Sequence, residues 1–396
     1  MQEDPIVIVG AARTPMGGFQ GSLTPLSAPE LGGYAIQGAV ERAGVPPEDV
    51  QDLIMGLCLF AGVKQAPARQ AAHLAGIPWD AGATTISKMC GSAMKATMLA
   101  HDNILAGSHD IMVAGGMESM TNAPYILPKA RGGYRLGNGD TVRDHMFMDG
   151  LEDAYDEGRL MGTFAEDTAE HYQFTREAQD NYAIESLTRA KKAVEDGSFD
   201  DEVVPVTVKT RKGETMVTSD EQPFNANIEK IPQLKPAFRK DGTVTPANSS
   251  SISDGAAALV LMKRSEAEKR GLTPKALIHA HSTHSQEPNW FTTAPIGAVK
   301  KVLEKTGWSK EEVDLFEVNE AFAVVAMAAM RDLDIPHDKI NVHGGACALG
   351  HPVGASGARI IVTLMSALEK YNLNKGVASL CIGGGEATAV SIERLN

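Results

Sequence analysis

The sequence predicts an α/β protein made of two related halves, and three observations carry this prediction. First, residues 41–50 and 304–313 share the pattern Glu-x-x-Gly-x-x-x-Glu-x-Val, at an offset of 304 − 41 = 263 positions. Second, helical patterns alternate with fully apolar strand patterns, which is typical of sheets buried on both faces. Third, residues 121–248 are richer in charged and turn residues, and a stretch this long predicts a subdomain rather than a loop.

The elements of the first half follow in order along the chain. An amphipathic helix over residues 35–42 breaks at the repeat glycine, and an acidic turn leads into an apolar strand at 52–60. A strand-like stretch at 83–87 precedes a helix of small and apolar residues at 90–105, which a glycine ends. An apolar strand at 110–116 then ends in two glycines.

The second half repeats this order. A helix at 298–305 precedes a strand at 314–318, and a helix at 355–368 is followed, after a break, by a strand at 377–384. Correspondence at such long separation indicates duplicated halves rather than a solenoid, whose repeat would be about 20–50 residues. Within the predicted subdomain at 121–248, residues 175–196 carry apolar residues at helical spacing and predict one clear helix.

Composition excludes several classes of protein. With 396 residues, 43% hydrophobic and 22% charged, the chain is typical of folded globular proteins. Its 37 basic and 50 acidic residues give a net charge of −13, which disfavours nucleic acid or an anionic membrane surface but permits a small anion in a local basic pocket. The longest apolar run, 321–330, is far shorter than the roughly 20 residues of a membrane span. We find no targeting segment and expect a cytoplasmic protein.

Cysteine and glycine usage narrows where chemistry could lie. The four cysteines are far apart and form no CxxC pair, so we expect reduced intracellular thiols rather than disulfides or a structural zinc site. Glycine makes up 39 of 396 residues, above the usual level of about 7%. Glycines cluster beside apolar runs at 115–116, 344–345, 350–357 and 383–385. These clusters indicate tight turns, where the backbone can approach a ligand closely.

Cys90 is the first candidate for chemistry, because it lies between a strand pattern and a helix that begins near Gly91. Free N–H groups at a helix N-terminus stabilise an anion, and a thiol there can have its pKa lowered to about 3.5–7.5. Read alone, this segment leaves two interpretations open: a nucleophile with room for substrate beside it, or a small buried core residue.

Three further residues are candidates, each with a plainer alternative. His351 lies among several glycines, where its ring could face a cavity or could hydrogen-bond loop backbone. Cys381 ends an apolar strand before a glycine turn, as a second thiol of the same site or as a buried strand residue. Asn319 opens the apolar segment after strand 314–318, as a site residue or as an ordinary helix cap.

Two other types of site are disfavoured. His279, His281 and His284 resemble metal ligands, and His279 and His281 should share a strand face. No acidic or cysteine partner lies at ligand spacing, so we expect no metal there. Residues 10–15 follow a strand without forming a GxGxxG motif, and 383–385 lie too near the C-terminus for a βαβ unit. A nicotinamide-dependent oxidoreductase is therefore disfavoured.

Eight segments are distinctive, at residues 12–18, 87–95, 115–120, 242–248, 254–257, 319–323, 344–359 and 381–385. Taken together, they resemble the thiolase family, in the right order and nearly from end to end. The resemblance implies a duplicated five-layered α/β/α/β/α fold with an inserted loop subdomain. We accordingly predict an N-terminal half at 1–120 plus 249–272, a loop subdomain at 121–248 for coenzyme A binding and oligomerisation, and a C-terminal half at 273–396.

The resemblance also implies roles for the candidate residues. Cys90 would accept the acyl group, His351 would activate it as a base, and Cys381 would move protons to and from the substrate. Asn319 would hold a water that forms one oxyanion site with His351, and the N–H groups of Cys90 and Gly383 would form the other. The implied enzyme is an acyltransferase that condenses two acetyl-CoA to acetoacetyl-CoA plus CoA, or cleaves a 3-ketoacyl-CoA with CoA. It needs no cofactor and no metal.

Other positions match the acyl-CoA pocket of the family. Ser250, Met161, Phe322 and Phe291 fall where the family lines its coenzyme A and acyl pocket. Residues 129–140 resemble the loop through which tetrameric members associate, although the same residues could form an ordinary solvated basic loop. The resemblance therefore implies acyl-CoA and CoA as partners and a homotetramer, with a place in fatty acid metabolism.

The chain departs from biosynthetic members of the family at several positions. Leu160 stands where they have His, Phe291 where they have Met, and Phe224 near a position where they have Arg. His343 replaces Asn, and residues 248–251 read NSSS in place of NASG. These changes leave the catalytic positions intact and bear on acyl-chain preference and nucleotide contacts.

Two alternative functions share this fold. A decarboxylating ketoacyl synthase would have a second histidine near Asn319, where the chain reads Asn-Glu-Ala-Phe. An inactive carrier or scaffold would need none of Cys90, His351 and Cys381, all of which are present.

Overall fold

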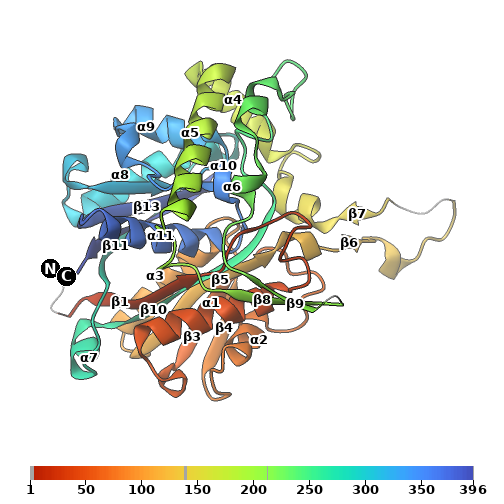
Figure 1. The fold of residues 1–396 in the computed structure, drawn as a ribbon. Coiled ribbons are helices and arrows are strands. Elements are labelled where there is room, and N and C mark those ends of the chain that lie inside the picture. The colour runs from red at the N-terminus through yellow and green to blue at the C-terminus, as the bar shows by residue number, and fades with distance from the viewer. Residues whose placement is uncertain (1–3, 138–140, 212, 396) are drawn as a thin grey trace.

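The computed structural model describes residues 4–137, 141–211 and 213–395. Its strands form one long mixed sheet that bends into two halves (Figure 1). The order across this sheet is β12-β13-β14-β11-β1-β10-β5-β3-β4, with β2 paired to β10. The strands are β1 (Ile6–Arg13), β2 (Gly17–Gly18), β3 (Asp52–Gly56), β4 (Gly82–Ile86), β5 (Ile111–Ser119), β10 (Ser253–Lys263), β11 (Ala276–Ser285), β12 (Leu315–Val318), β13 (Lys375–Ile382) and β14 (Glu386–Arg394).

The two halves of the sheet meet at a short ladder. Strands β1 and β11 share only two residue pairs, Val7 with Leu277 and Ile8 with Ala276. On either side the ladders are much longer, and β10 pairs with β5 over nine residues, from Asp254 to Met262. The N-terminal strands and the C-terminal strands therefore behave as two sheets joined at one seam.

Helices cover both halves and also fill the space between them. They are α1 (Ala28–Ala43), α2 (Pro67–Leu74), α3 (Ser92–Leu105), α4 (Met161–Tyr172), α5 (Arg176–Glu195), α6 (Gln222–Asn225), α7 (Arg264–Lys269), α8 (Ala294–Thr306), α9 (Ala323–Leu333), α10 (Ala346–Leu349) and α11 (Ser356–Lys370). One apolar cluster joins α1 and α2 to the N-terminal strands, and a second joins α8 and α9 to the C-terminal strands. A third cluster packs α3 and α11 against strands of both halves. The layers are therefore helix, sheet, helix, sheet, helix, and the predicted α/β/α/β/α fold is confirmed.

Strand β10 shows how the sequence produces these layers. Its residues are buried on both faces, because alternate side chains enter two different cores. Ala258 and Val260 pack with α1 and α2, whereas Leu259 and Leu261 pack with α3 and α11. Such a strand must be apolar throughout, which is the pattern that predicted buried sheets.

The internal repeat is a repeat of structure. Helix α1 ends at Gly44 and α8 ends at Gly307, both in the left-handed conformation, with φ of 66° and 71°. A short 3-10 turn follows each glycine before β3 or β12 begins. The predicted breaks are confirmed, although α1 and α8 start earlier than the predicted helices at 35–42 and 298–305.

The predicted strand at 52–60 is too long. Strand β3 ends at Gly56, because the chain beyond it binds a side chain instead of a neighbouring strand. The N–H groups of Cys58 and Leu59 donate to the buried carboxylate of Glu118, at 2.9 and 3.2 Å. A carboxylate contributed by another strand therefore ends the ladder at this point.

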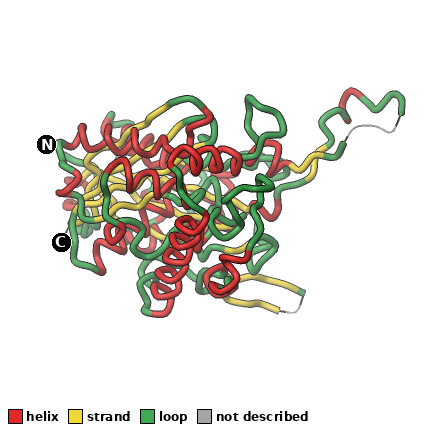
Figure 2. The backbone as a smooth tube through the Cα atoms, turned by 90° about the horizontal axis from the view of Figure 1, so that it is seen from above, coloured by secondary structure: helices red, strands yellow, loops and turns green. Residues whose placement is uncertain are grey.

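The segment between β5 and β10 contains α4, α5, α6, an arm and a hairpin. The hairpin is β8 (Val206–Thr210) with β9 (Gly213–Val217). The arm is built on β6 (Tyr125–Ile126) and β7 (Arg143–Asp144) and extends far from the body (Figures 1 and 2). The last three residues of the predicted association loop, 138–140, lie outside the described residues.

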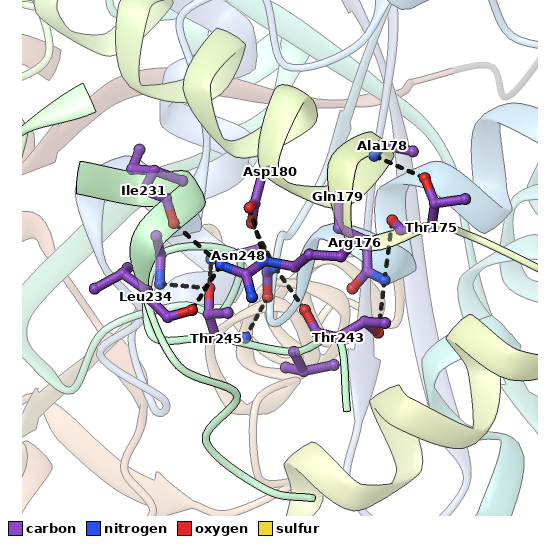
Figure 3. Close-up of polar contacts among 12 residues, drawn as sticks. Thr175, Arg176, Ala178, Gln179, Asp180, Ile231, Leu234, Thr243, Thr245 and Asn248 are labelled. Carbon is purple, nitrogen blue, oxygen red and sulfur yellow. Dashed lines mark hydrogen bonds and ion pairs between the residues drawn. The ribbon is translucent and has the colours of Figure 1, made fainter. Parts of the chain in front are cut away.

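Helix α5 anchors the chain that leads into β10 (Figure 3). Asn248 donates to Asp180 Oδ1 at 3.0 Å, and its own Oδ1 accepts the N–H of Thr245 at 2.7 Å. Arg176 donates to the carbonyls of Ile231 and Leu234. These contacts fix residues 249–252, which enter the cavity described below.

Within the described ranges, no helix is long and apolar enough to cross a membrane. The four cysteines are all free, as the sequence predicted.

Backbone contact between the two halves at Gly116 gives a test of the fold. A Cβ added at Gly116 would lie 2.0 Å from the carbonyl oxygen of Gly354, so neither β5 nor the 350–357 loop has room to yield. We expect Gly116→Ala to lower the free energy of unfolding by about 2 kcal/mol or more, measured by urea denaturation. Gly132→Ala is the control, because no atom of the described residues lies within 4 Å of its added Cβ. Equal stability of the two variants would contradict the close contact.

Candidate active site

A cavity of about 360 Å³ lies where the inserted segment covers the junction of the two halves. Its wall is mostly apolar and includes Leu151, Phe238, Ile252 and Val353. Seven of the nine predicted site residues line it, namely Cys90, Met161, Ser250, Phe291, Phe322, His351 and Gly383. The other two, Asn319 and Cys381, are buried beside lining residues, as described below.

Cys90 lies in a sharp turn between β4 and α3. Met89 has φ of +47°, a conformation that an unbranched side chain adopts only when its surroundings hold it there. Ser92 stabilises the turn, because its Oγ accepts the N–H of Lys88 at 2.8 Å and donates to the Met89 carbonyl at 2.6 Å. The turn presents the thiol to the cavity at the start of α3.

Burial, and not the helix, sets the charge of Cys90. Removal from water raises the pKa of the Cys90 thiol to about 11, even though N–H groups of Gly383 and of Cys90 itself favour the thiolate. The expectation that the helix N-terminus lowers this pKa is therefore wrong. The same two N–H groups are those predicted to form an oxyanion site.

His351 is held as a neutral base. Its Nδ1 lies 2.6 Å from Ser356 Oγ, which donates its only hydrogen to the Pro352 carbonyl at 2.9 Å. Ser356 Oγ must therefore accept the hydrogen bond from His351. We accordingly assign the ring proton to Nδ1, which leaves a lone pair on Nε2. Nε2 is buried and has no partner within the described residues. Burial and the nearby Arg359 lower the pKa of His351 to about 3.

Asn319 lies next to the imidazole at the end of β12. Its Nδ2 is 3.4 Å from His351 Nδ1, and its Oδ1 accepts from Arg359 Nη2 at 3.3 Å. The N-cap of α9 is Phe322 rather than Asn319, so the helix-cap interpretation is wrong. The Arg359 contact holds the amide with its NH₂ group toward the histidine.

Cys381 lies close to Cys90. It is fully buried near the end of β13, and the pKa of its thiol is raised well above the usual value by burial and by the Cys90 sulfur. Gly384 and Gly385, with φ of 97° and 95°, then turn the chain into β14. This turn places Gly383 in the cavity wall with Cys90 and His351, and Cys381 is buried next to Cys90 without lining the cavity.

Glu118 is a residue that the sequence analysis did not single out. Besides the N–H groups of Cys58 and Leu59, its carboxylate accepts the N–H of Gly354 at 2.9 Å. It thereby joins the two halves beneath the loop that carries His351. Burial raises the pKa of Glu118 to about 7. The sequence does indicate a special role for Glu118, because it is the one carboxylate in a strand that is otherwise almost entirely apolar.

The departures from the family pattern lie in different places. Leu160 and Phe291 are in the cavity wall, where Phe291 packs edge-to-face on Phe164 with ring centroids 5.9 Å apart. Phe224 is half exposed on α6. His343 is outside this cavity and contacts the rings of Phe199 and Tyr371.

His279 and His281 do not share a strand face. A bulge between Ile278 and Ala280 shifts the register of β11, so the side-chain alternation is broken there. His279 contacts Glu393 of β14, whereas His281 contacts Asp102 of α3.

The fold and the site together match one family. A family model of the thiolase N-terminal domain matches residues 6–265, and one of the thiolase C-terminal domain matches residues 272–394. The chain belongs to the thiolase family.

Particular relatives match from end to end. An acetyl-CoA acetyltransferase of Cupriavidus necator is 47% identical over 98% of this chain and 99% of its own. A cytosolic acetyl-CoA acetyltransferase of Mus musculus is 48% identical, with 99% and 98% covered. The crystal structure of the Bacillus anthracis acetyl-CoA acetyltransferase superimposes with a TM-score of 0.96 at 43% identity, over 99% of both chains. Similarity of this extent identifies the chain as an acyltransferase.

The protonation of Cys90 and His351 can be tested through the reactivity of the thiol. Because the pKa of Cys90 is about 11 and that of His351 about 3, both groups are neutral at pH 7. The rate of Cys90 alkylation by iodoacetamide should therefore rise about 100-fold from pH 7 to pH 9, as the thiolate fraction grows. Mass spectrometry of the Cys90 peptide gives the rate, with Cys90→Ser as the control for other sites. A rate that is constant over this range would indicate a preformed thiolate–imidazolium pair instead.

Proposed function

We propose that this protein catalyses reversible Claisen chemistry on coenzyme A thioesters through an acyl-Cys90 intermediate. In one direction two acetyl-CoA give acetoacetyl-CoA plus CoA, and in the other CoA cleaves a 3-ketoacyl-CoA. The observation that carries the proposal is a cavity lined by Cys90 and by a neutral His351 whose Nε2 lone pair is unpaired among the described residues, with the second thiol, Cys381, buried next to Cys90. Relatives that match end to end are acetyl-CoA acetyltransferases by name.

The first half-reaction is acyl transfer to Cys90. His351 Nε2 takes the thiol proton as the sulfur attacks the thioester carbon. The N–H groups of Cys90 and Gly383 favour negative charge on the Cys90 sulfur. The same groups stabilise the tetrahedral oxyanion. When the C–S bond to coenzyme A breaks, the departing thiolate takes the proton of Cys381, which becomes a thiolate, while His351 keeps the Cys90 proton on Nε2. The thioester on Cys90 keeps the acyl group activated.

The second half-reaction forms a carbon–carbon bond. Cys381, as the thiolate, removes a proton from the α-carbon of a second acetyl-CoA. The enolate oxygen then accepts hydrogen bonds from His351 and from a water held by Asn319. The enolate carbon attacks the acyl carbon, the C–S bond to Cys90 breaks, and the Cys90 thiolate takes back its proton from His351 Nε2. Each oxyanion donor is worth about 3 kcal/mol of transition-state stabilisation, because the wall around the site excludes water.

The substrate pocket and the chemistry need only this chain and coenzyme A esters. Ser250, Met161, Phe291 and Phe322 line the space beside Cys90, where the acyl group and the pantetheine arm would lie. The thioester is already an activated acyl donor, so we propose that neither a metal nor a further cofactor takes part. Asn319, in place of a second histidine, disfavours decarboxylative condensation.

We also propose a homotetramer that associates through the arm. Apolar side chains that project from it include Leu136, which is 95% exposed, together with Tyr125 and Val142. A projecting, apolar arm is stable in water only when another surface covers it. We keep the predicted division into two halves and a loop subdomain for coenzyme A binding and oligomerisation. We propose a cytoplasmic enzyme of fatty acid metabolism, supported by a relative named as cytosolic.

Acylation of Cys90 is the direct test of the proposed function. Incubation with radiolabelled acetyl-CoA should place one acetyl group on the Cys90 peptide, and Cys90→Ser should lose both the label and thiolysis of acetoacetyl-CoA, by at least about 1,000-fold. Cys347→Ser is the matched control, since Cys347 lies outside the cavity wall. Full thiolysis activity in Cys90→Ser would rule out this mechanism.

The two thiols should separate into two half-reactions. Cys381→Ala removes the proposed acid/base but leaves the nucleophile and its base, so Cys90 should still be acetylated. Condensation measured by acetoacetyl-CoA formation should fall by about 100-fold or more. If acetylation and condensation are lost together in a folded variant, the proposed division of roles between Cys90 and Cys381 is wrong.

A further inference from the structure

A second cluster of chemically active side chains lies at the far end of α3 from Cys90. His101 and Asp102 are in the last turns of this helix, and His281 comes from β11 of the C-terminal half. The three ligand atoms that these residues offer lie within 4.8 Å of one another. The cluster therefore joins the two halves through side chains 179 positions apart in the sequence.

The carboxylate of Asp102 is placed between two imidazoles. Its Oδ1 lies 3.0 Å from His101 Nδ1 and 2.8 Å from His281 Nε2. The imidazole rings of His101 and His281 stand nearly perpendicular, at 88°, with centroids 5.1 Å apart. Nδ1 of His101 has its partner inside the cluster, whereas its Nε2 is buried without one among the described residues.

We propose that His101, Asp102 and His281 form a binding site for a divalent transition metal of the Zn²⁺ class. Two imidazole nitrogens and a carboxylate oxygen are a common donor set for Zn²⁺, with the fourth tetrahedral position left to water. Ligand atoms around tetrahedral Zn²⁺ are about 3.3 Å apart, since each lies about 2.0–2.2 Å from the metal. Asp102 Oδ1 lies 2.8 and 3.0 Å from the two imidazole nitrogens, and all three ligand atoms lie within 4.8 Å of one another, so modest side-chain movements reach this geometry.

Burial suits the cluster to a metal at the protein surface. The side chains of His101 and His281 are only 6% and 16% exposed, so packing holds both rings in position. Asp102 is 50% exposed, which leaves a path for the ion and room for a bound water. The sequence analysis found no acidic partner for the histidines of 279–284, because Asp102 belongs to a different half of the chain.

The site would stabilise the fold and would not take part in the acyl chemistry. Residues 90 and 102 are separated by about 18 Å along the helix, at about 1.5 Å per residue, which is too far for contact with a substrate on Cys90. A metal held by α3 and β11 would instead connect the central helix of the N-terminal half to the C-terminal sheet. Its binding energy would add to the stability of the folded state alone.

The test uses the full-length protein with Cys90 alkylated by iodoacetamide, so that the catalytic sulfur cannot bind metal. Zn²⁺ is titrated in competition with a chromophoric chelator, and the unfolding temperature is measured with and without Zn²⁺. We expect one Zn²⁺ per chain and a higher unfolding temperature. Asp102→Asn and His281→Gln should each weaken binding by about 100-fold, since even loss of a residue that only supports a ligand costs 10–100-fold.

His279→Gln is the matched control, because this histidine is on the same strand and pairs with Glu393 outside the cluster. It should bind Zn²⁺ like the parent. Asp102→Asn keeps the size of an exposed side chain, so it tests the site even if His281→Gln does not fold. The proposal is overturned if the parent binds no Zn²⁺, or if both cluster variants fold and retain the parent affinity.

Discussion

Every feature of the catalytic cavity depends on how closely α3 and α11 pack side by side between the two halves of the sheet. A Cβ at Gly357 would lie 2.4 Å from the backbone nitrogen of Met94, so these helices approach each other at backbone distance near their N-termini. Because both helices begin at the same place, the turn that precedes α3 and the loop that precedes α11 deliver Cys90 and His351 to one cavity. A bulkier residue at this contact would separate them.

Burial then determines the electrostatics of the site. Burial disfavours charge on the groups at the cavity, which keeps both thiols protonated and the imidazole neutral at pH 7. The N–H groups of Cys90 and Gly383 cannot offset the cost of burying a thiolate on Cys90. They act instead on the oxyanion of the substrate, where a low local dielectric strengthens each hydrogen bond. A resting site without a thiolate is also protected from oxidation, since oxidants react with the thiolate form.

The sequence predicted the architecture well, because apolar periodicity and glycine breaks report local structure directly. The glycine ends of α1 and α8 and the alternation of helices and strands were all readable. The sequence could not predict contacts that form only in the folded structure. Glu118 ends β3, Ser356 determines the tautomer of His351, and Asp102 contacts His281. The raised pKa of Cys90 was missed for the same reason, because local position at a helix N-terminus says nothing about how much water the fold removes.

The repeated order of helix, glycine, turn and strand carries a consequence for the ancestry of the chain. Helices α3 and α11 occupy equivalent places in the two halves, yet one follows a cysteine turn and the other a histidine loop. A symmetric ancestor with two identical halves would have presented the same side chain twice. The pairing of a thiol with an imidazole in one site therefore requires the two halves to differ in sequence at these equivalent places.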